Sequence, residues 1–157
     1  MKTPVHVVTG FLGAGKTTFL IDQLAQRDGQ RCGVVVNDFG DARIDATLLG
    51  GKVPVTEIPG GCICCTAPQD LVPALAELLP QVDRVFVEAT GLARPADIVD
   101  TLTRSKLDVS VGPVICLIDA RRLVGDAPEL LLEQLDASDM VVANHASECD
   151  EDAWAAL

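Results

Sequence analysis

The chain has 157 residues, of which 48% are hydrophobic and 22% charged, a balance that favours one globular domain over residues 1–157. Its formal net charge of −11 argues against nucleic acid or an anionic membrane as the main partner, because both attract basic proteins. No apolar run approaches the roughly 18 residues of a membrane span and the first residues do not form a signal peptide, so we expect a cytoplasmic protein with reduced cysteines.

Short apolar segments alternate with helix-like segments along almost the whole chain. The apolar segments are rich in Val and Ile and continuous instead of alternating in polarity, which is typical of strands covered on both faces. The alternation predicts an α/β fold: a doubly wound, mostly parallel sheet with right-handed crossovers and helices on both faces. The predicted strands are Val5–Thr9, Cys32–Asn37, Val53–Ile58, Arg84–Glu88, Val114–Asp119 and Met140–Asn144, and the predicted helices are Lys16–Gln26, Gln69–Leu79, Pro95–Arg104 and Glu129–Asp136.

The segment GFLGAGKTT lies between the first predicted strand and the first predicted helix. It fits the pattern G-x-x-x-x-G-K-[ST] at Gly10, Gly15, Lys16 and Thr17. Glycines in such a loop let the backbone approach a phosphate, and the N-terminus of the following helix adds positive partial charge. We therefore expect Lys16 to reach the β- and γ-phosphates of a nucleotide and the Thr17 hydroxyl to bind Mg²⁺. A glycine-rich turn without a ligand is the alternative.

Acidic residues follow the second and fourth predicted strands. Asp38, Asp41 and Asp45 in NDFGDARID are candidates for a nucleotide-responsive loop or a metal site, although each taken singly is more commonly a solvated carboxylate. In RVFVEATG the fourth strand leads directly to Glu88, which we expect to hold Mg²⁺ through water or to polarise the attacking water. The Gly91 N–H is expected to sense the γ-phosphate. Capping of the next helix is the alternative role for Glu88.

Three cysteines, Cys62, Cys64 and Cys65, follow the third predicted strand in GGCICC. In an extended segment the first two point the same way, and the preceding glycines allow a turn that brings in the third. Thiolates favour Zn²⁺ or Cu(I), so with one outside ligand the cluster forms an incomplete site, suited to a metal that is held and passed on. Packing thiols and a redox-sensing pair are the alternatives. Cys32 and Cys116 fall in apolar strands and are expected in the core.

The segments GFLGAGKTTFL, NDFG…ID, GGCICC and EATGLARP, in this order and spacing, resemble the CobW-like P-loop GTPases. These are metallochaperone GTPases related to those that mature hydrogenase and urease. The resemblance runs from Val5 to Asn144 and implies a P-loop nucleotide domain without the family's C-terminal domain. It also implies that GTP binding and hydrolysis are coupled to delivery of zinc, cobalt or another metal to a client metalloprotein, whose identity the sequence does not give.

The resemblance also implies roles for single residues. Lys16 and Glu88 would be catalytic, and Thr17 and Glu88 would hold Mg²⁺. Cys62, Cys64, Cys65 and Asp38 would bind Zn²⁺ or another soft or borderline divalent ion. The nucleotide-binding residues would be Gly10, Gly13, Ala14, Gly15, Lys16, Thr17, Thr18, Gly91 and Asn144.

The chain departs from the family at the base-recognition motif Asn-Lys-x-Asp. Asn144 is present, but His145 stands in place of the Lys and Ser147 in place of the Asp. The family Asp accepts two hydrogen bonds from guanine, which the neutral Ser147 cannot do, so ATP stays open beside GTP. Glu148 replaces it only if the loop shifts by one residue. This departure leaves open an alternative function: a degenerate regulatory module that binds nucleotide or metal, turns over little and acts through a protein partner. A weaker alternative, which rests on the three cysteines, is a thiol redox sensor.

Overall fold

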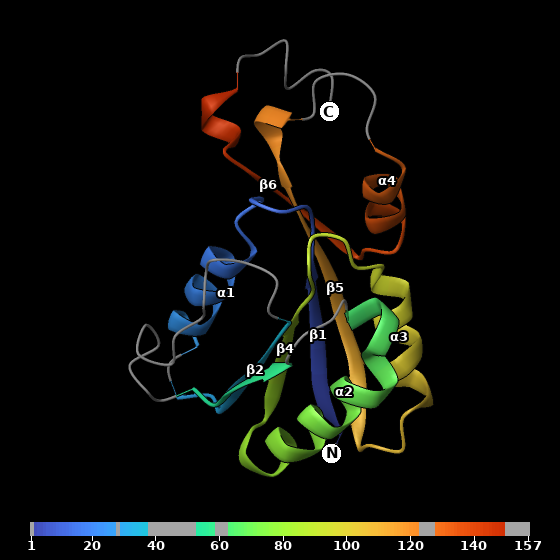
Figure 1. Ribbon diagram of the computed structural model, residues 1–157. Coiled ribbons are helices and arrows are strands. Elements are labelled where there is room, and N and C mark those ends of the chain that lie inside the picture. Colours follow the sequence, from blue (N-terminus) through green and yellow to red (C-terminus); the bar gives the residue numbers. More distant parts are fainter. Residues whose placement is uncertain (1, 28, 38–52, 59–62, 123–127, 150–157) are drawn as a thin grey trace.

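The computed structural model describes residues 2–27, 29–37, 53–58, 63–122 and 128–149. At residues 37 and 63–68 it describes the backbone and not the side chains. Six parallel strands in this part of the chain form one sheet in the order β3-β2-β4-β1-β5-β6 (Figure 1). None of its helices is long and apolar enough to cross a membrane. The strands are β1 (Thr3–Thr9), β2 (Cys32–Asn37), β3 (Val55–Ile58), β4 (Arg84–Glu88), β5 (Val109–Asp119) and β6 (Met140–Asn144), and the helices are α1 (Lys16–Ala25), α2 (Ile63–Leu78), α3 (Pro95–Arg104) and α4 (Glu129–Asp136), with short 3-10 helices at Leu79–Gln81, Ala120–Arg122 and Ala146–Glu148.

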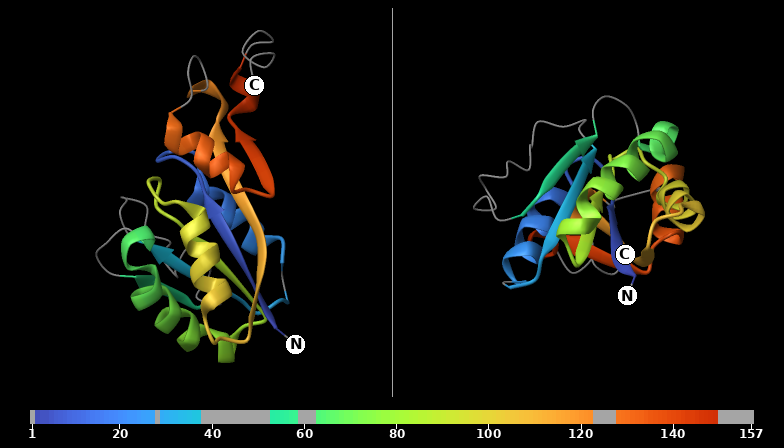
Figure 2. Two further views of the ribbon diagram at one scale, coloured as in Figure 1. Left: turned by 90° about the vertical axis from the view of Figure 1, so that its right-hand side faces the viewer. Right: turned by 90° about the horizontal axis from the view of Figure 1, so that it is seen from below.

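Helices cover both faces of the sheet. The turned views show α2 and α3 together on one face and α1 on the other (Figure 2). Because side chains alternate along a strand, Val5 and Val7 of the central strand β1 face α2 and α3, whereas Val8 faces α1. This arrangement confirms the predicted doubly wound α/β fold. It also brings the carboxyl ends of all six strands to one edge, where such folds bind ligands.

Strand β5 begins five residues before the predicted start, at Val109 instead of Val114. Gly112 and Pro113 end the apolar pattern in the sequence, but in the structure they occupy an irregularity in the pairing of β5 with β1, which the sheet tolerates as a local bulge. A Cβ at Gly112 would lie 2.8 Å from His6 Nδ1 on β1, so the close approach of the two strands requires a glycine there.

Helix α2 also begins earlier than predicted, at Ile63 instead of Gln69. The preference of proline for the start of a helix places that start after Pro68. In the structure Pro68 lies inside the helix, where it costs about 3 kcal/mol. Three leucines farther along α2 are at most 2% exposed, and their burial, worth about 1.5–3 kcal/mol each, holds the helix on the sheet despite this cost. Because α2 begins at Ile63, the backbone of Cys64 and Cys65 is helical, and the extended arrangement considered for this segment does not apply to these two residues.

Candidate nucleotide site

The glycine-rich loop connects β1 to α1 at the carboxyl edge of the sheet. Gly10, Gly13 and Gly15 have φ angles of 127°, 80° and 92°, in the left-handed region that side chains rarely adopt. Helix α1 begins at Lys16 directly after the loop, and no described side chain caps its N-terminus. The first N–H groups of α1 and the positive end of its dipole are therefore available to a phosphate.

Lys16 is the cation of this loop and is almost fully buried, with 8% of its surface exposed. Its Nζ donates hydrogen bonds to the carbonyl oxygens of Gly10 (2.8 Å) and Phe11 (3.0 Å). Burial lowers the pKa of the Lys16 ammonium, and the Glu88 carboxylate acts in the opposite direction. An ammonium has three donors, so the loop carbonyls hold it in place while one donor remains for a phosphate.

Thr17 and Glu88 meet across the interior of the site. The Thr17 hydroxyl donates a 2.8 Å hydrogen bond to Glu88 Oε1, whereas the buried Oε2 has no partner among the described residues. Glu88 is 7% exposed, and burial raises the pKa of its carboxyl against the opposing effects of Thr17 and Lys16. A buried carboxylate with an unpaired oxygen beside a hydroxyl is a set of hard oxygen donors that suits Mg²⁺. The chemistry of these two side chains therefore fits the predicted magnesium site.

Asn144, at the end of β6, ties that strand to the glycine-rich loop. Its Nδ2 donates to the carbonyl oxygen of Ala14 at 3.0 Å, and its Oδ1 accepts from the His145 N–H at 2.9 Å. His145 itself has a φ of 58°, which turns the chain sharply after the strand. Asn144 therefore lies next to the predicted phosphate site and is hydrogen-bonded to the loop that forms it.

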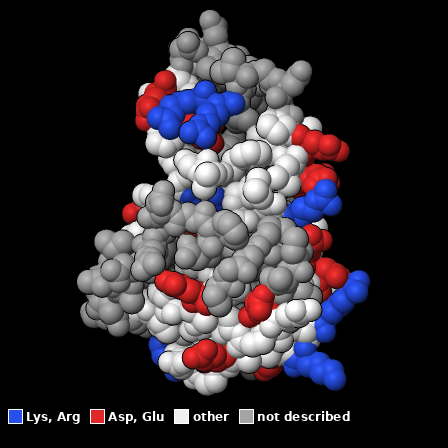
Figure 3. Space-filling model, viewed as in Figure 1, with Lys and Arg blue, Asp and Glu red and all other residues white. Residues whose placement is uncertain are grey.

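A network of charges occupies the ends of β5 and β6. Arg121 binds the Asp119 carboxylate at 2.9 Å and Glu148 Oε2 at 2.9 Å, and Glu148 Oε1 lies 2.9 Å from His145 Nδ1. Hydrogen bonding to Arg121 lowers the pKa of Asp119 to about 2. Figure 3 shows basic side chains gathered beside acidic ones in this region. Ser147, at the position of the family's Asp, is exposed, and both oxygens of the neighbouring Glu148 carboxylate are engaged by Arg121 and His145.

Two polar side chains near the loop were not singled out by the sequence. Arg122 donates to the carbonyl oxygen of Leu12 at 3.3 Å, so a guanidinium lies beside the glycine-rich loop. Gln134 of α4 is fully buried and contacts the loop after Glu88. The only signal for Gln134 was a glutamine at a position of α4 that the helical period turns inward.

The predicted phosphate-site residues lie together at this edge. Glu88 contacts Thr17, Asn144 contacts Ala14, and Gly91 lies against the backbone of Leu12. Thr18 is exposed in the first turn of α1. The nucleotide and magnesium roles of these residues stay predictions.

The predicted metal ligands are a different case. Cys62 and Asp38, like Asp41 and Asp45, lie outside the described residues, and for Cys64 and Cys65 only the backbone is described, in the first turn of α2. No group of three or more His, Cys, Asp or Glu side chains in the described part of the chain is arranged to hold a metal. The C-x-C-C site stays a prediction.

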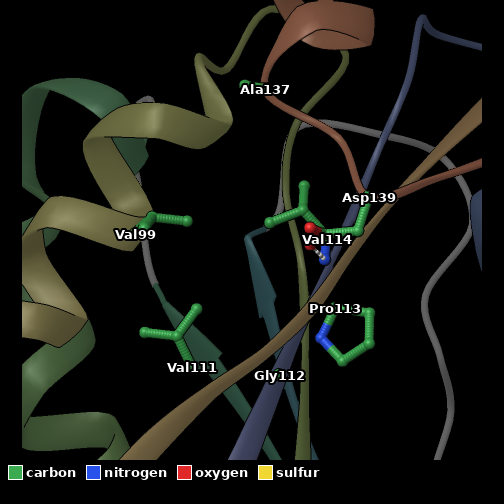
Figure 4. Close-up of a pocket in the computed structure, with 7 residues that line it drawn as sticks. All are labelled: Val99, Val111, Gly112, Pro113, Val114, Ala137 and Asp139. Atoms are coloured by element: carbon green, nitrogen blue, oxygen red, sulfur yellow. Dashed lines mark hydrogen bonds between the residues drawn. The ribbon is translucent and has the colours of Figure 1, made fainter.

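An apolar pocket lies elsewhere on the molecule. It is lined from α3, β5 and the turn before β6, and Figure 4 shows the Asp139 carboxylate at its edge, where it accepts a 2.8 Å hydrogen bond from the Val114 N–H. None of the predicted phosphate-site residues lines it. Its lining residues are Val99, Val111, Gly112, Pro113, Val114, Ala137 and Asp139.

A parallel sheet of this order, with a glycine-rich loop running from its central strand into a helix, defines a P-loop nucleotide-binding domain. Over residues 4–156 the sequence matches the family described as "CobW/HypB/UreG, nucleotide-binding domain", and the chain belongs to that family.

Relatives of this chain carry names that refer to zinc. The zinc chaperone YeiR of Escherichia coli (strain K12) is 36% identical over 164 residues, which cover 99% of this chain and 50% of YeiR. The zinc-regulated GTPase metalloprotein activator 1 of Schizosaccharomyces pombe (strain 972 / ATCC 24843) is 31% identical over 157 residues, covering 90% of this chain and 38% of the activator. The solved structure of a Zn(II)-bound triple mutant of the YjiA GTPase has a TM-score of 0.65 at 27% identity, covering 94% of this chain and 52% of the other. The chain spans about half the length of YeiR and of the CobW relatives it matches.

Proposed function

We propose that this chain binds and hydrolyses a nucleoside triphosphate, GTP by its family, and couples the nucleotide state to a metal ion. By its relatives that ion is zinc, held by Cys62, Cys64 and Cys65 for delivery to a client metalloprotein. One observation carries the nucleotide half of the proposal: the Thr17–Glu88 hydrogen bond beside the Lys16 ammonium, with Glu88 Oε2 buried and unpaired. The membership in a family of GTPase domains supports it.

In this proposal each residue of the site has a separate role in phosphoryl transfer. Lys16 supplies the fixed positive charge for the β- and γ-phosphates, and the N–H groups at the start of α1 bind their oxygens. Thr17 and Glu88 would hold Mg²⁺, which when bound offsets negative charge on the phosphates. Burial raises the pKa of Glu88, while Thr17 and Lys16 act against that rise, and the charged form of Glu88 can also orient a water molecule for attack.

The metal half of the proposal concerns cargo. Three thiolates with Asp38 as an outside ligand would hold Zn²⁺ in a site open enough to release it. Helix α2, which begins at Ile63 beside Cys64 and Cys65, follows β3, so it starts at the same edge of the sheet as Glu88. A nucleotide-driven shift at this edge is therefore near enough to open or close the thiol site.

The base side of the site favours weak discrimination between GTP and ATP. Ser147 offers no carboxylate, and the Glu148 carboxylate is held by Arg121 and His145. Guanine would have to displace one of these partners to gain its two hydrogen bonds, which reduces the free-energy difference between the two bases. We expect a GTP preference smaller than that of a GTPase with the complete motif.

Two measurements test the proposal. Multiple-turnover hydrolysis of GTP and ATP with Mg²⁺ should exceed that of Lys16→Ala, which removes the fixed cation. Turnover no higher than in this variant, with nucleotide still bound, would instead support the binding module without catalysis.

In a competition titration, zinc affinity should differ between the nucleotide-free and triphosphate-bound protein. Equal affinities, or zinc binding unchanged after all three cysteines are replaced by serine, would contradict the metal half.

A further inference from the structure

Gln134 of α4 is fully buried, with none of its surface exposed. Its Nε2 donates hydrogen bonds to two carbonyl oxygens of the loop that follows Glu88, at Gly91 (3.2 Å) and Ala93 (3.0 Å). Both partners are acceptors, so the amide nitrogen and not the amide oxygen must face them. Burying an amide is costly without such partners. This side chain therefore fixes the position of the loop from Gly91 to Ala93.

The same loop is pressed from its other side against the glycine-rich loop. A Cβ added to Gly91 would lie 2.5 Å from the Leu12 nitrogen and 3.1 Å from the Leu12 Cα. There is no room for a side chain at position 91. Because close-packed groups transmit displacement, a movement of Gly91 must shift Leu12, Gln134 or both.

Helix α4 contacts the glycine-rich loop directly as well. Leu131 and Leu135 of α4 belong to an apolar cluster that includes Phe11 of that loop and Cys116 and Ile118 of β5. The helix thus touches, through different side chains, both loops that would surround the γ-phosphate.

One further contact and one unpaired atom bear on how firmly α4 is held. Arg94 Nε lies 3.0 Å from Glu133 Oε2, an ion pair that joins α4 to the start of α3 but is too exposed to contribute much. Gln134 Oε1, in contrast, is buried and has no partner among the described residues. The Gln134 amide uses its nitrogen twice and leaves its oxygen without a hydrogen bond. If the loop is displaced, one of its N–H groups can donate to Oε1 and give a second hydrogen-bonding arrangement.

We propose that Gln134 is a positioning residue for the γ-phosphate sensor at Gly91, and that α4 is the element whose position reports whether a triphosphate or a diphosphate is bound. The proposal rests on the proposed function. By holding the carbonyls of Gly91 and Ala93, the Gln134 amide fixes the peptide that follows Gly91 and so limits where the Gly91 N–H can lie. A γ-phosphate that attracts this N–H displaces the loop, and the two hydrogen bonds pass the displacement to α4. A diphosphate has no group at that position and leaves α4 where it is.

The test uses Gln134→Met, which keeps the length of the side chain and removes both donors. Dissociation constants are measured for GDP and for a non-hydrolysable GTP analogue, both with Mg²⁺. Loss of two hydrogen bonds should weaken analogue binding about tenfold and leave GDP binding within about twofold. The control is Ser138→Ala, which removes the 2.6 Å bond from Ser138 Oγ to the backbone carbonyl of Gln134 and does not touch the loop. It should leave both constants unchanged.

The outcomes separate the two proposals. If wild-type protein binds neither nucleotide, the proposed function fails and this inference fails with it. If wild type binds both and Gln134→Met weakens the binding of GDP and of the analogue equally, or of neither, the sensor role alone is refuted.

Hydrogen exchange of wild-type protein covers the case in which the variant does not fold. Amides of α4 should exchange at different rates with GDP and with the analogue, while those at the end of α2 should not, and equal rates in α4 would refute the relay.

Discussion

Replacing Asn144 by alanine tests the nucleotide site without altering the glycine-rich loop itself. The substitution removes the hydrogen bond to the Ala14 carbonyl and the one from the His145 N–H. Each is worth about 0.5–1.5 kcal/mol net, so we expect the free energy of unfolding to fall by about 2 kcal/mol. For a chain of this size that corresponds to a melting temperature lower by about 4–8 °C.

The effect on binding has the same origin. Without the Asn144 amide the loop loses its connection to β6, and it must be ordered when a phosphate binds. We therefore expect the dissociation constants of GDP and of a GTP analogue to rise together, by about tenfold. Calorimetry and titration of a fluorescent nucleotide measure both effects, with Ser147→Ala, an exposed position in the same turn, as the matched control. A variant that melts and binds like the control would show that Asn144 does not hold the loop.

Other substitutions test the charges and the sheet. Because burial raises the pKa of Glu88 above its ordinary value near 4.5, its charge costs stability as pH rises. Unfolding titrations should therefore show wild type losing stability relative to Glu88→Gln from about pH 4.5 upward, and Mg²⁺ should no longer raise the melting temperature of the variant. Asp119, with a pKa of about 2 against an ordinary 3.8, contributes stability above pH 3.8 that disappears as pH falls toward 2, so the acid-unfolding curves of wild type and Asp119→Asn should converge there. Gly112→Ala should cost about 1–3 kcal/mol in urea unfolding, because its Cβ would lie 2.8 Å from His6 Nδ1, and full stability would contradict this close approach.

The fold was predictable because its strands are buried on both faces. Continuous Val-rich segments and the intervening helices gave the doubly wound parallel sheet, and Cys32 and Cys116 are in the core, as expected for cysteines in such strands. The misplaced boundaries have local causes. At Gly112 the sequence pattern breaks but the hydrogen-bonded ladder continues around a bulge, and at Pro68 the helix continues through a residue whose local preference is for a helix start.

The site was predictable only where a motif fixes it. The pattern around Lys16 and Thr17 depends on the spacing of adjacent residues, which a sequence shows directly. The contact of Thr17 with Glu88 joins residues 71 positions apart, and only the parallel order of β1 and β4 brings them together. Gln134 and Arg122 carry no motif, because their roles depend on packing against a loop far away in sequence.

The residues around the proposed site fall into two groups with different constraints. Asn144 keeps the family identity although the Lys and Asp after it are replaced. Its contacts give it a structural role, because its amide bonds to the carbonyl of Ala14 in the glycine-rich loop and to the His145 N–H. A change at Asn144 therefore costs stability whichever base is bound. The side chains of His145 and Ser147 have no comparable hydrogen bond to the glycine-rich loop among the described residues. The carboxylate of Glu148 is bound by Arg121. The contacts expected to bind phosphate are thus separate from those expected to select the base. In the proposed function, base selection can therefore weaken while phosphate binding, and the proposed coupling through Gly91 and Gln134, is retained.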